Sequence, residues 1–204
     1  MEERNPYAAP KAPVIAGDEP TRLPGDPEEF EYGGFWRRVG AAFLDGIIMI
    51  PMGLLLFFLM YKTSQAYLYY LVPSIVVSLF YYVYLVKRFG GTPGKRIIGM
   101  RITMVDGSPV TTQAAVIRYA PFFVLQVLAI LAALKGQLTP VDNYDSLSFL
   151  EKMQTLQRSQ SAWSGLITGI TYIWWIATAI TLAANFRKRA AHDFMAGTVV
   201  LRTD

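Results

Sequence analysis

The chain has 204 residues, of which 53% are hydrophobic and 17% are charged, and its net charge is +4 at pH 7. Apolar residues this abundant, gathered in long blocks, are typical of a membrane protein and not of a soluble domain. The chain has no cysteine, which excludes disulfides, thiolate metal sites and cysteine nucleophiles.

Residues 1–30 contain six prolines and few apolar side chains. Segments of this composition cannot bury enough apolar surface to fold, so we expect a disordered cytoplasmic tail. It does not resemble a signal peptide, because the first apolar block begins only near residue 39. Residues 31–204 are then the transmembrane domain.

Four apolar stretches follow, at about 39–61, 66–86, 114–134 and 163–184. Each is close to the roughly 20 residues that a helix needs to cross a bilayer. Tyrosines cluster at both ends of the second stretch, as in the aromatic belts of membrane proteins. The sequence therefore predicts an all-α integral membrane protein, a four-helix transmembrane bundle in the cell membrane.

Lysine and arginine set the expected orientation. Five precede the first stretch, six lie at 87–118 and four follow the last stretch, whereas only Lys62, Lys135, Lys152 and Arg158 lie in the other two loops. Cytoplasmic loops carry the excess of these residues. We therefore expect both termini and the middle loop in the cytoplasm. The basic residues follow the loops, so no nucleic-acid partner is expected.

Asp45 interrupts the first apolar stretch, and a carboxylate there costs about 2.5 to 3.5 kcal/mol on insertion scales. Arg38, Ala41 and Asp45 share one helix face, with Asp45 about 10 Å deeper than Arg38. We therefore expect Arg38 to reach toward Asp45, directly or through water. Pro51 leaves the carbonyl of Ile47 without its helical donor. Two interpretations stay open: a cation or proton site, or a charge pair that holds the bundle together.

The middle loop contains Gly-Gly-Thr-Pro-Gly-Lys at 90–95, which is similar to a phosphate-binding loop. It lacks the first glycine, and Arg96 stands where Ser or Thr would bind magnesium. Residues 101–105 alternate polar and apolar side chains before the Asp106-Gly107 turn signal, and residues 198–202 alternate similarly. We predict that these two segments pair in a small cytoplasmic β element.

The remaining polar residues carry weaker signals. His192 is the single histidine and cannot build a metal site alone. We expect Asp193 beside it to pair with a nearby basic residue. Gly165 and Gly169 allow close helix packing, within the chain or in a dimer. A polar face on the fourth stretch could line a path or bond across helices; it comprises Thr168, Thr171, Thr178 and Asn185. No catalytic constellation is visible, so we expect neither an enzyme nor a cofactor.

Three patches together resemble the RDD family of membrane proteins: Arg38 with Asp45, the loop GTPGKRIIGMRITMVDG, and the tail AAHDFMAGTVVLR. The resemblance covers about 32–202. It implies that Arg38 and Asp45 are the first two residues of the family's name, and that Asp193 is the second aspartate. It also implies a role in transport, since some members are linked to cation–proton exchange. The long loop 135–162 and the Pro-rich tail depart from the family's compact pattern.

Two function classes follow. The first is a small transporter or exchanger that uses Asp45 as the site for a monovalent cation or proton, gated near Arg38. The candidate residues for an ion or charge-pair site are Arg38, Asp45 and Asp193. The second is a membrane scaffold or assembly factor that binds a partner protein. Four spans make a narrow bundle, so transport favours a homodimer.

Overall fold

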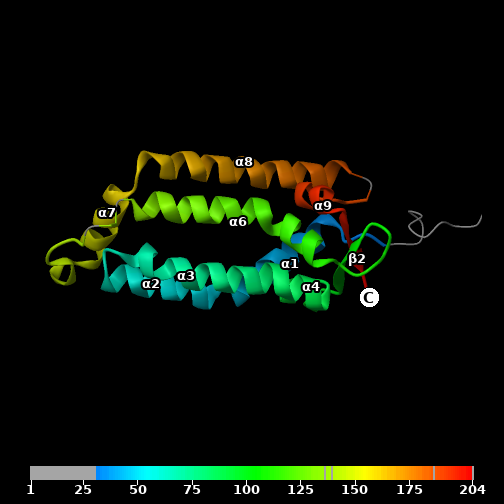
Figure 1. The fold of residues 1–204 in the computed structure, drawn as a ribbon, viewed down its shortest axis with the longest axis horizontal. Helices are drawn as coiled ribbons and strands as arrows, with labels where there is room; N and C mark the ends of the chain where they lie inside the picture. Colours follow the sequence, from blue (N-terminus) through cyan, green and yellow to red (C-terminus); the bar gives the residue numbers. More distant parts are fainter. Residues whose placement is uncertain (1–30, 136, 139, 186, 204) are drawn as a thin grey trace, which may run out of the picture.

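The computed structural model describes residues 31–135, 137, 138, 140–185 and 187–203, so the expected disordered tail lies outside the described residues. The helices run side by side along one long axis (Figure 1). One end of this bundle carries the C-terminal strand, and the opposite end carries α7 (Phe149–Ser159).

The first predicted stretch is two helices, α1 (Phe35–Ile48) and α2 (Ile50–Lys62), bent by 46°. Pro51 lies in the first turn of α2, where its missing N–H costs nothing. It cannot continue the hydrogen bonds of α1, which explains the break at Met49.

The second stretch is an almost continuous rod made of α3 (Ala66–Leu79), the π-helical turn η1 (Phe80–Tyr84) and α4 (Leu85–Phe89). Gly90 ends the rod with φ of +71°, a left-handed conformation that favours glycine. The short helix α5 (Pro93–Ile97) follows and packs against α1.

The other two stretches are single helices, α6 (Thr112–Leu134) and α8 (Ala162–Ala184). The Thr111 side chain accepts the Ala114 N–H and caps α6. Within the part of the chain that the structure describes, three helical segments are long and apolar enough to cross a membrane, or four if the bent pair counts as one span. These lengths and compositions are compatible with the predicted membrane bundle.

Strand β1 (Met100–Met104) pairs antiparallel with β2 (Thr198–Arg202), and Ile102 lies opposite Val200. Both side chains are buried in a small core with Ala41 of α1 and Ala115 of α6. The predicted pairing of these two segments is therefore confirmed, with β1 beginning one residue earlier than expected. The helix α9 (Ala191–Ala196) leads directly into β2.

The polar loop between α6 and α8 contains the 3-10 turn η2 (Tyr144–Ser146) and α7. Ser148 and Glu151 form a capping box that begins α7. The Lys152 Nζ donates to the carbonyl of Tyr61 at 3.0 Å. This bond ties α7 to the C-terminal end of α2.

Candidate functional site

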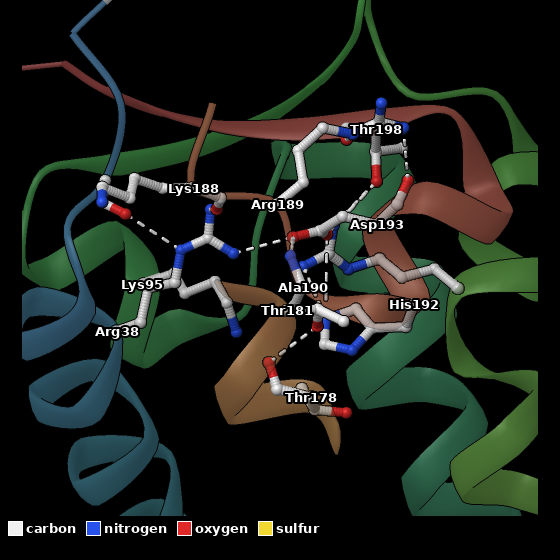
Figure 2. Close-up of polar contacts among 12 residues, drawn as sticks. Arg38, Lys95, Thr178, Thr181, Lys188, Arg189, Ala190, His192, Asp193 and Thr198 are labelled. Carbon is white, nitrogen blue, oxygen red and sulfur yellow. Dashed lines mark hydrogen bonds and ion pairs between the residues drawn. The ribbon is translucent and has the colours of Figure 1, made fainter. Parts of the chain in front are cut away.

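Arg38 lies in the first turn of α1 and is buried. Its Nη1 lies 2.7 Å from Asp193 Oδ2, its Nε donates to the Gly33 carbonyl at 3.0 Å, and its Nη2 donates to the Lys188 carbonyl. Figure 2 shows the guanidinium reaching from α1 to Asp193. The expected pairing with Asp45 is therefore wrong: Arg38 extends toward the end of the bundle that carries α9, as long basic side chains do.

Asp193 is fully buried in α9 and receives a second arginine, Arg118 of α6, on its other oxygen. Its Oδ2 also accepts the Ala190 N–H at 3.0 Å. Burial raises the pKa of the Asp193 carboxyl, but Arg118 and Arg38 outweigh burial, so this pKa lies below its ordinary value. The carboxylate joins α1, α6 and α9.

Arg118 was not singled out from the sequence. Its Nη1 donates to Thr198 Oγ1 at 2.9 Å, and its Nη2 lies 3.3 Å from His192 Nε2. The sequence did contain a signal for it, because Arg118 is an arginine in the first turns of an otherwise apolar helix. We call Arg38, Arg118, His192, Asp193 and Thr198 the Asp193 cluster.

The contact with Arg118 sets the proton on His192. Guanidinium nitrogens only donate, so His192 Nε2 accepts and Nδ1 carries the hydrogen. Burial, together with the nearby Arg118, lowers the pKa of His192 to about 3. The imidazole is therefore neutral at pH 7.

Asp45 is buried and has its own set of partners. Its carboxylate accepts from Tyr81 Oη at 2.6 Å, from Thr92 Oγ1 at 2.6 Å and from the Gly94 N–H at 2.7 Å. The Lys95 Nζ lies 3.8 Å away. We call these five residues the Asp45 cluster; its cation is Lys95 and not Arg38.

The sequence around residue 92 explains this geometry. Thr92 supplies a hydroxyl, and Pro93 begins α5 with a fixed φ. A Cβ added at Gly94 would lie 2.6 Å from Asp45 Oδ1 and would also collide with the Ala41 carbonyl. Only glycine lets α5 approach α1 this closely, which gives the Thr-Pro-Gly-Lys pattern a structural role.

Tyr81 lies in the π-helical turn η1. Such turns insert one extra residue into an α-helix and are frequent at functional sites. Neither the turn nor the bond from Tyr81 was predicted, because a π-helical turn leaves no mark in hydrophobic periodicity.

A partly open cavity of about 220 Å³ lies between the α1–α2 break, α3 and α6. Hydrogen bonds continue around it: Tyr119 Oη donates to Gln126 Oε1 at 2.7 Å, and Gln126 Nε2 donates to the Ser74 carbonyl at 3.4 Å. The residues that line it are Met49, Met52, Gly53, Tyr70, Ser74, Val77, Ser78, Tyr82 and Gln126.

The cavity adjoins the Asp45 cluster along the chain. The Met49 N–H bonds to the backbone carbonyl of Asp45 at 3.0 Å. Tyr82 lines the cavity, whereas its neighbour Tyr81 bonds to the Asp45 side chain. Polar groups therefore extend from the middle of the bundle to α5.

The polar residues and glycines predicted on the fourth stretch, now α8, belong to neither cluster. The hydroxyls of Thr168 and Thr171 donate to the carbonyls of Ser164 and Ile167 in their own helix. A Cβ at Gly165 or Gly169 would meet nothing within 4 Å, so neither glycine packs against another described helix. Among the described residues, no group of three His, Asp or Glu side chains could hold a metal ion.

Comparison with known proteins agrees with the three sequence patches. The uncharacterized protein YckC of Bacillus subtilis (strain 168) is 28% identical over 177 residues, which cover 84% of this chain and 85% of that protein. No solved structure matches the chain. The RDD family matches residues 32–197, a range that contains Arg38, Asp45 and Asp193, and the chain therefore belongs to the RDD family.

Proposed function

We propose that this protein is a small multi-pass transporter of the cell membrane, in which the Asp45 cluster carries a proton or monovalent cation. One observation supports the proposal above all: a buried carboxylate, Asp45, lies among apolar helices and is bonded to Tyr81, whose chain neighbour Tyr82 lines a cavity with both polar and apolar walls. Polar groups inside a membrane are costly and are typical of substrate paths.

The exposed surface supports placement in a lipid bilayer. The large side chains of α2 and α8 face outward, among them Leu54, Phe57, Ile173 and Ile176. Water would make such a surface an aggregation liability, whereas lipid tails solvate it. The lysine and arginine count supports cytoplasmic termini.

The Asp45 cluster suggests how an ion would act on the bundle. A proton on the Asp45 carboxyl removes the charge that attracts Lys95 and turns one acceptor oxygen into a donor. The bonds from Thr92 and Gly94 then weaken, and these bonds hold α5 against α1. Protonation would therefore loosen the contact between α1 and α5 next to the cavity.

The alternative is a scaffold or assembly factor without transport. It is favoured by the contacts of the two acids, since each oxygen of Asp45 and of Asp193 already has a partner within the chain. In that case the acids hold the fold together, and a partner protein binds elsewhere.

Flux into proteoliposomes separates the two. Purified protein is reconstituted with a trapped pH-sensitive dye, and sodium or potassium is added outside. We expect the wild type to exchange protons, Asp45→Asn to lose most of the exchange, and Asp145→Asn to retain it, because Asp145 is exposed in η2. Equal signals from wild-type, Asp45→Asn and empty liposomes would favour the scaffold.

A further inference from the structure

We propose that the cavity between the α1–α2 break, α3 and α6 binds a small uncharged molecule, about the size of one aromatic ring, that both donates and accepts hydrogen bonds. The inference goes beyond the proposed function and does not rest on it, because it concerns binding in the cavity and not the ion carried at the Asp45 cluster.

The lining carries no formal charge. Its polar members are Tyr70, Ser74, Ser78, Tyr82 and Gln126, and the rest are apolar. A bare ion would exchange its hydration shell for a few neutral oxygens, at a large cost in desolvation. Asp45 is not among the residues that line the cavity, so its carboxylate does not offset this cost. Neutral hydrogen-bonding ligands avoid the penalty.

The serines are acceptors toward the cavity. Ser74 Oγ donates its hydrogen to the Leu71 carbonyl at 2.8 Å, and Ser78 Oγ donates to the Ile75 carbonyl at 3.0 Å. Each hydroxyl has a single hydrogen, so both oxygens retain lone pairs for a donor on the ligand. Both serines are buried, one turn apart on α3.

Gln126 supplies the complementary donor. Its Oε1 accepts from Tyr119, and one hydrogen of Nε2 points to the Ser74 carbonyl. The amide nitrogen carries two hydrogens, so the second is available to an acceptor on the ligand. The Ser74 carbonyl can only accept, and this contact fixes which end of the amide is nitrogen.

The volume and the walls set the size and shape. A cavity of about 150 Å³ holds benzene, and this cavity measures about 220 Å³, which leaves room for a ring with a few further atoms. Met49 and Met52 form part of the wall contributed by the helix break, and methionine adapts well to an aromatic face. The ligand is therefore amphipathic, with polar groups toward α3 and α6.

Gly53 provides a way to close the cavity without disturbing the fold. It lines the cavity, and a Cβ added there meets nothing within 4 Å. Gly46 is equally unhindered but does not line the cavity. Leucine at either position improves helix propensity by the same amount, so Gly46→Leu is a matched control.

The test uses three probes with the same ring and different charge: 4-fluorophenol, 4-fluorobenzylammonium and 4-fluorobenzoate. Their ¹⁹F line widths are measured with the full chain in nanodiscs, against empty nanodiscs to subtract partition into lipid. We expect saturable broadening of 4-fluorophenol with wild type and Gly46→Leu. Gly53→Leu should weaken the binding of 4-fluorophenol at least tenfold. Gly53→Ala should weaken it by a smaller factor, and this variant replaces the leucine variant in the test if the latter does not fold.

Two results would overturn the inference. In the first, the ammonium or the carboxylate probe binds more tightly than the phenol, and substitution of Gly53 weakens that binding. In the second, substitution of Gly53 changes the binding of none of the three probes. Ion exchange into proteoliposomes is measured separately from probe binding. Gly53-sensitive phenol binding in a protein that exchanges no ions supports the inference while the transport proposal fails. Exchange lost in Asp45→Asn without probe binding supports transport and removes the inference.

Discussion

Arg38 and Asp193, 155 positions apart in the chain, form a direct ion pair with 2.7 Å between Nη1 and Oδ2. The pair fastens the beginning of the first helix to the last helix. Asp45, seven residues from Arg38, bonds instead to η1, Thr92 and α5. The three residues therefore belong to two separate clusters.

Mutational coupling should follow these clusters. Breaking a buried ion pair costs about 3 to 5 kcal/mol, so Arg38→Met and Asp193→Leu should each lower stability strongly. Their double mutant should be less destabilised than the sum, although Arg118 stays unpaired and recovery is partial. Arg38→Met and Asp45→Leu share no hydrogen-bond partner, and only the charge of Lys95 acts on both, so their coupling should be much weaker than that of Arg38 and Asp193.

The measurement is the free energy of unfolding in detergent, determined for the wild type and for the single and double variants. Strong coupling between positions 38 and 45, with additivity between 38 and 193, would contradict the structure.

The glycine of the loop gives a second prediction. Gly94→Ala should destabilise the protein by about 1 to 3 kcal/mol, the usual cost of overpacking, because its methyl group would lie 2.6 Å from Asp45 Oδ1. Gly91→Ala is the control, since its methyl group would meet only the Lys95 and Arg96 side chains at 3.5 Å or more. Melting temperatures of both variants test this, and equal losses would refute it.

His192 predicts an acid-sensitive stability. Its pKa in the folded protein is about 3, below the ordinary value of about 6.5 that applies to the unfolded chain. Between these values the unfolded chain binds a proton that the folded protein does not. Stability therefore rises with pH in this window, by up to about 1.4 kcal/mol per pH unit, and levels off above it.

His192→Gln should remove this contribution. The comparison is best made from pH 5 to 6.5, because the loss of the Asp193 contribution begins only at lower pH, near the ordinary pKa of a carboxyl. Thermal unfolding of the two proteins across this range is the measurement. Identical pH slopes would show that the imidazole is not held neutral.

Orientation is tested on this cysteine-free chain with Asp106→Cys and Asp145→Cys, both at exposed positions. We expect an impermeant maleimide to label position 145 in intact cells and position 106 only after permeabilisation. The reverse pattern would invert the proposed topology.

The sequence predicted the elements well and the polar contacts poorly. Apolar blocks and alternation located the helices and the β1–β2 pair, because periodicity reports which face is buried. Arg38 was assigned to Asp45 because helical spacing reveals neighbours only within one helix. The true partner of Arg38 is Asp193 of α9, and Asp193 binds a second arginine, Arg118 of α6. Contacts between residues so far apart in the chain are set by the packing of the helices.

The Asp45 contacts were hidden for a related reason. The single acid within the first apolar stretch was evident, but its donors come from a π-helical turn and from a backbone N–H after a proline. The Thr-Pro-Gly-Lys segment was compared with phosphate loops, whereas it presents its donors to a carboxylate of the same chain.

The ion pair between α1 and α9 also has a consequence for biosynthesis. A ribosome adds about 5 to 20 residues per second, so the carboxylate of Asp193 emerges on the order of 10 s after Arg38. During that interval the arginine of the first helix has no carboxylate partner from α9. Synthesis of α9, which delivers Asp193 just before β2, is therefore the event that locks the first helix, and a nascent chain arrested before it leaves that arginine without its carboxylate.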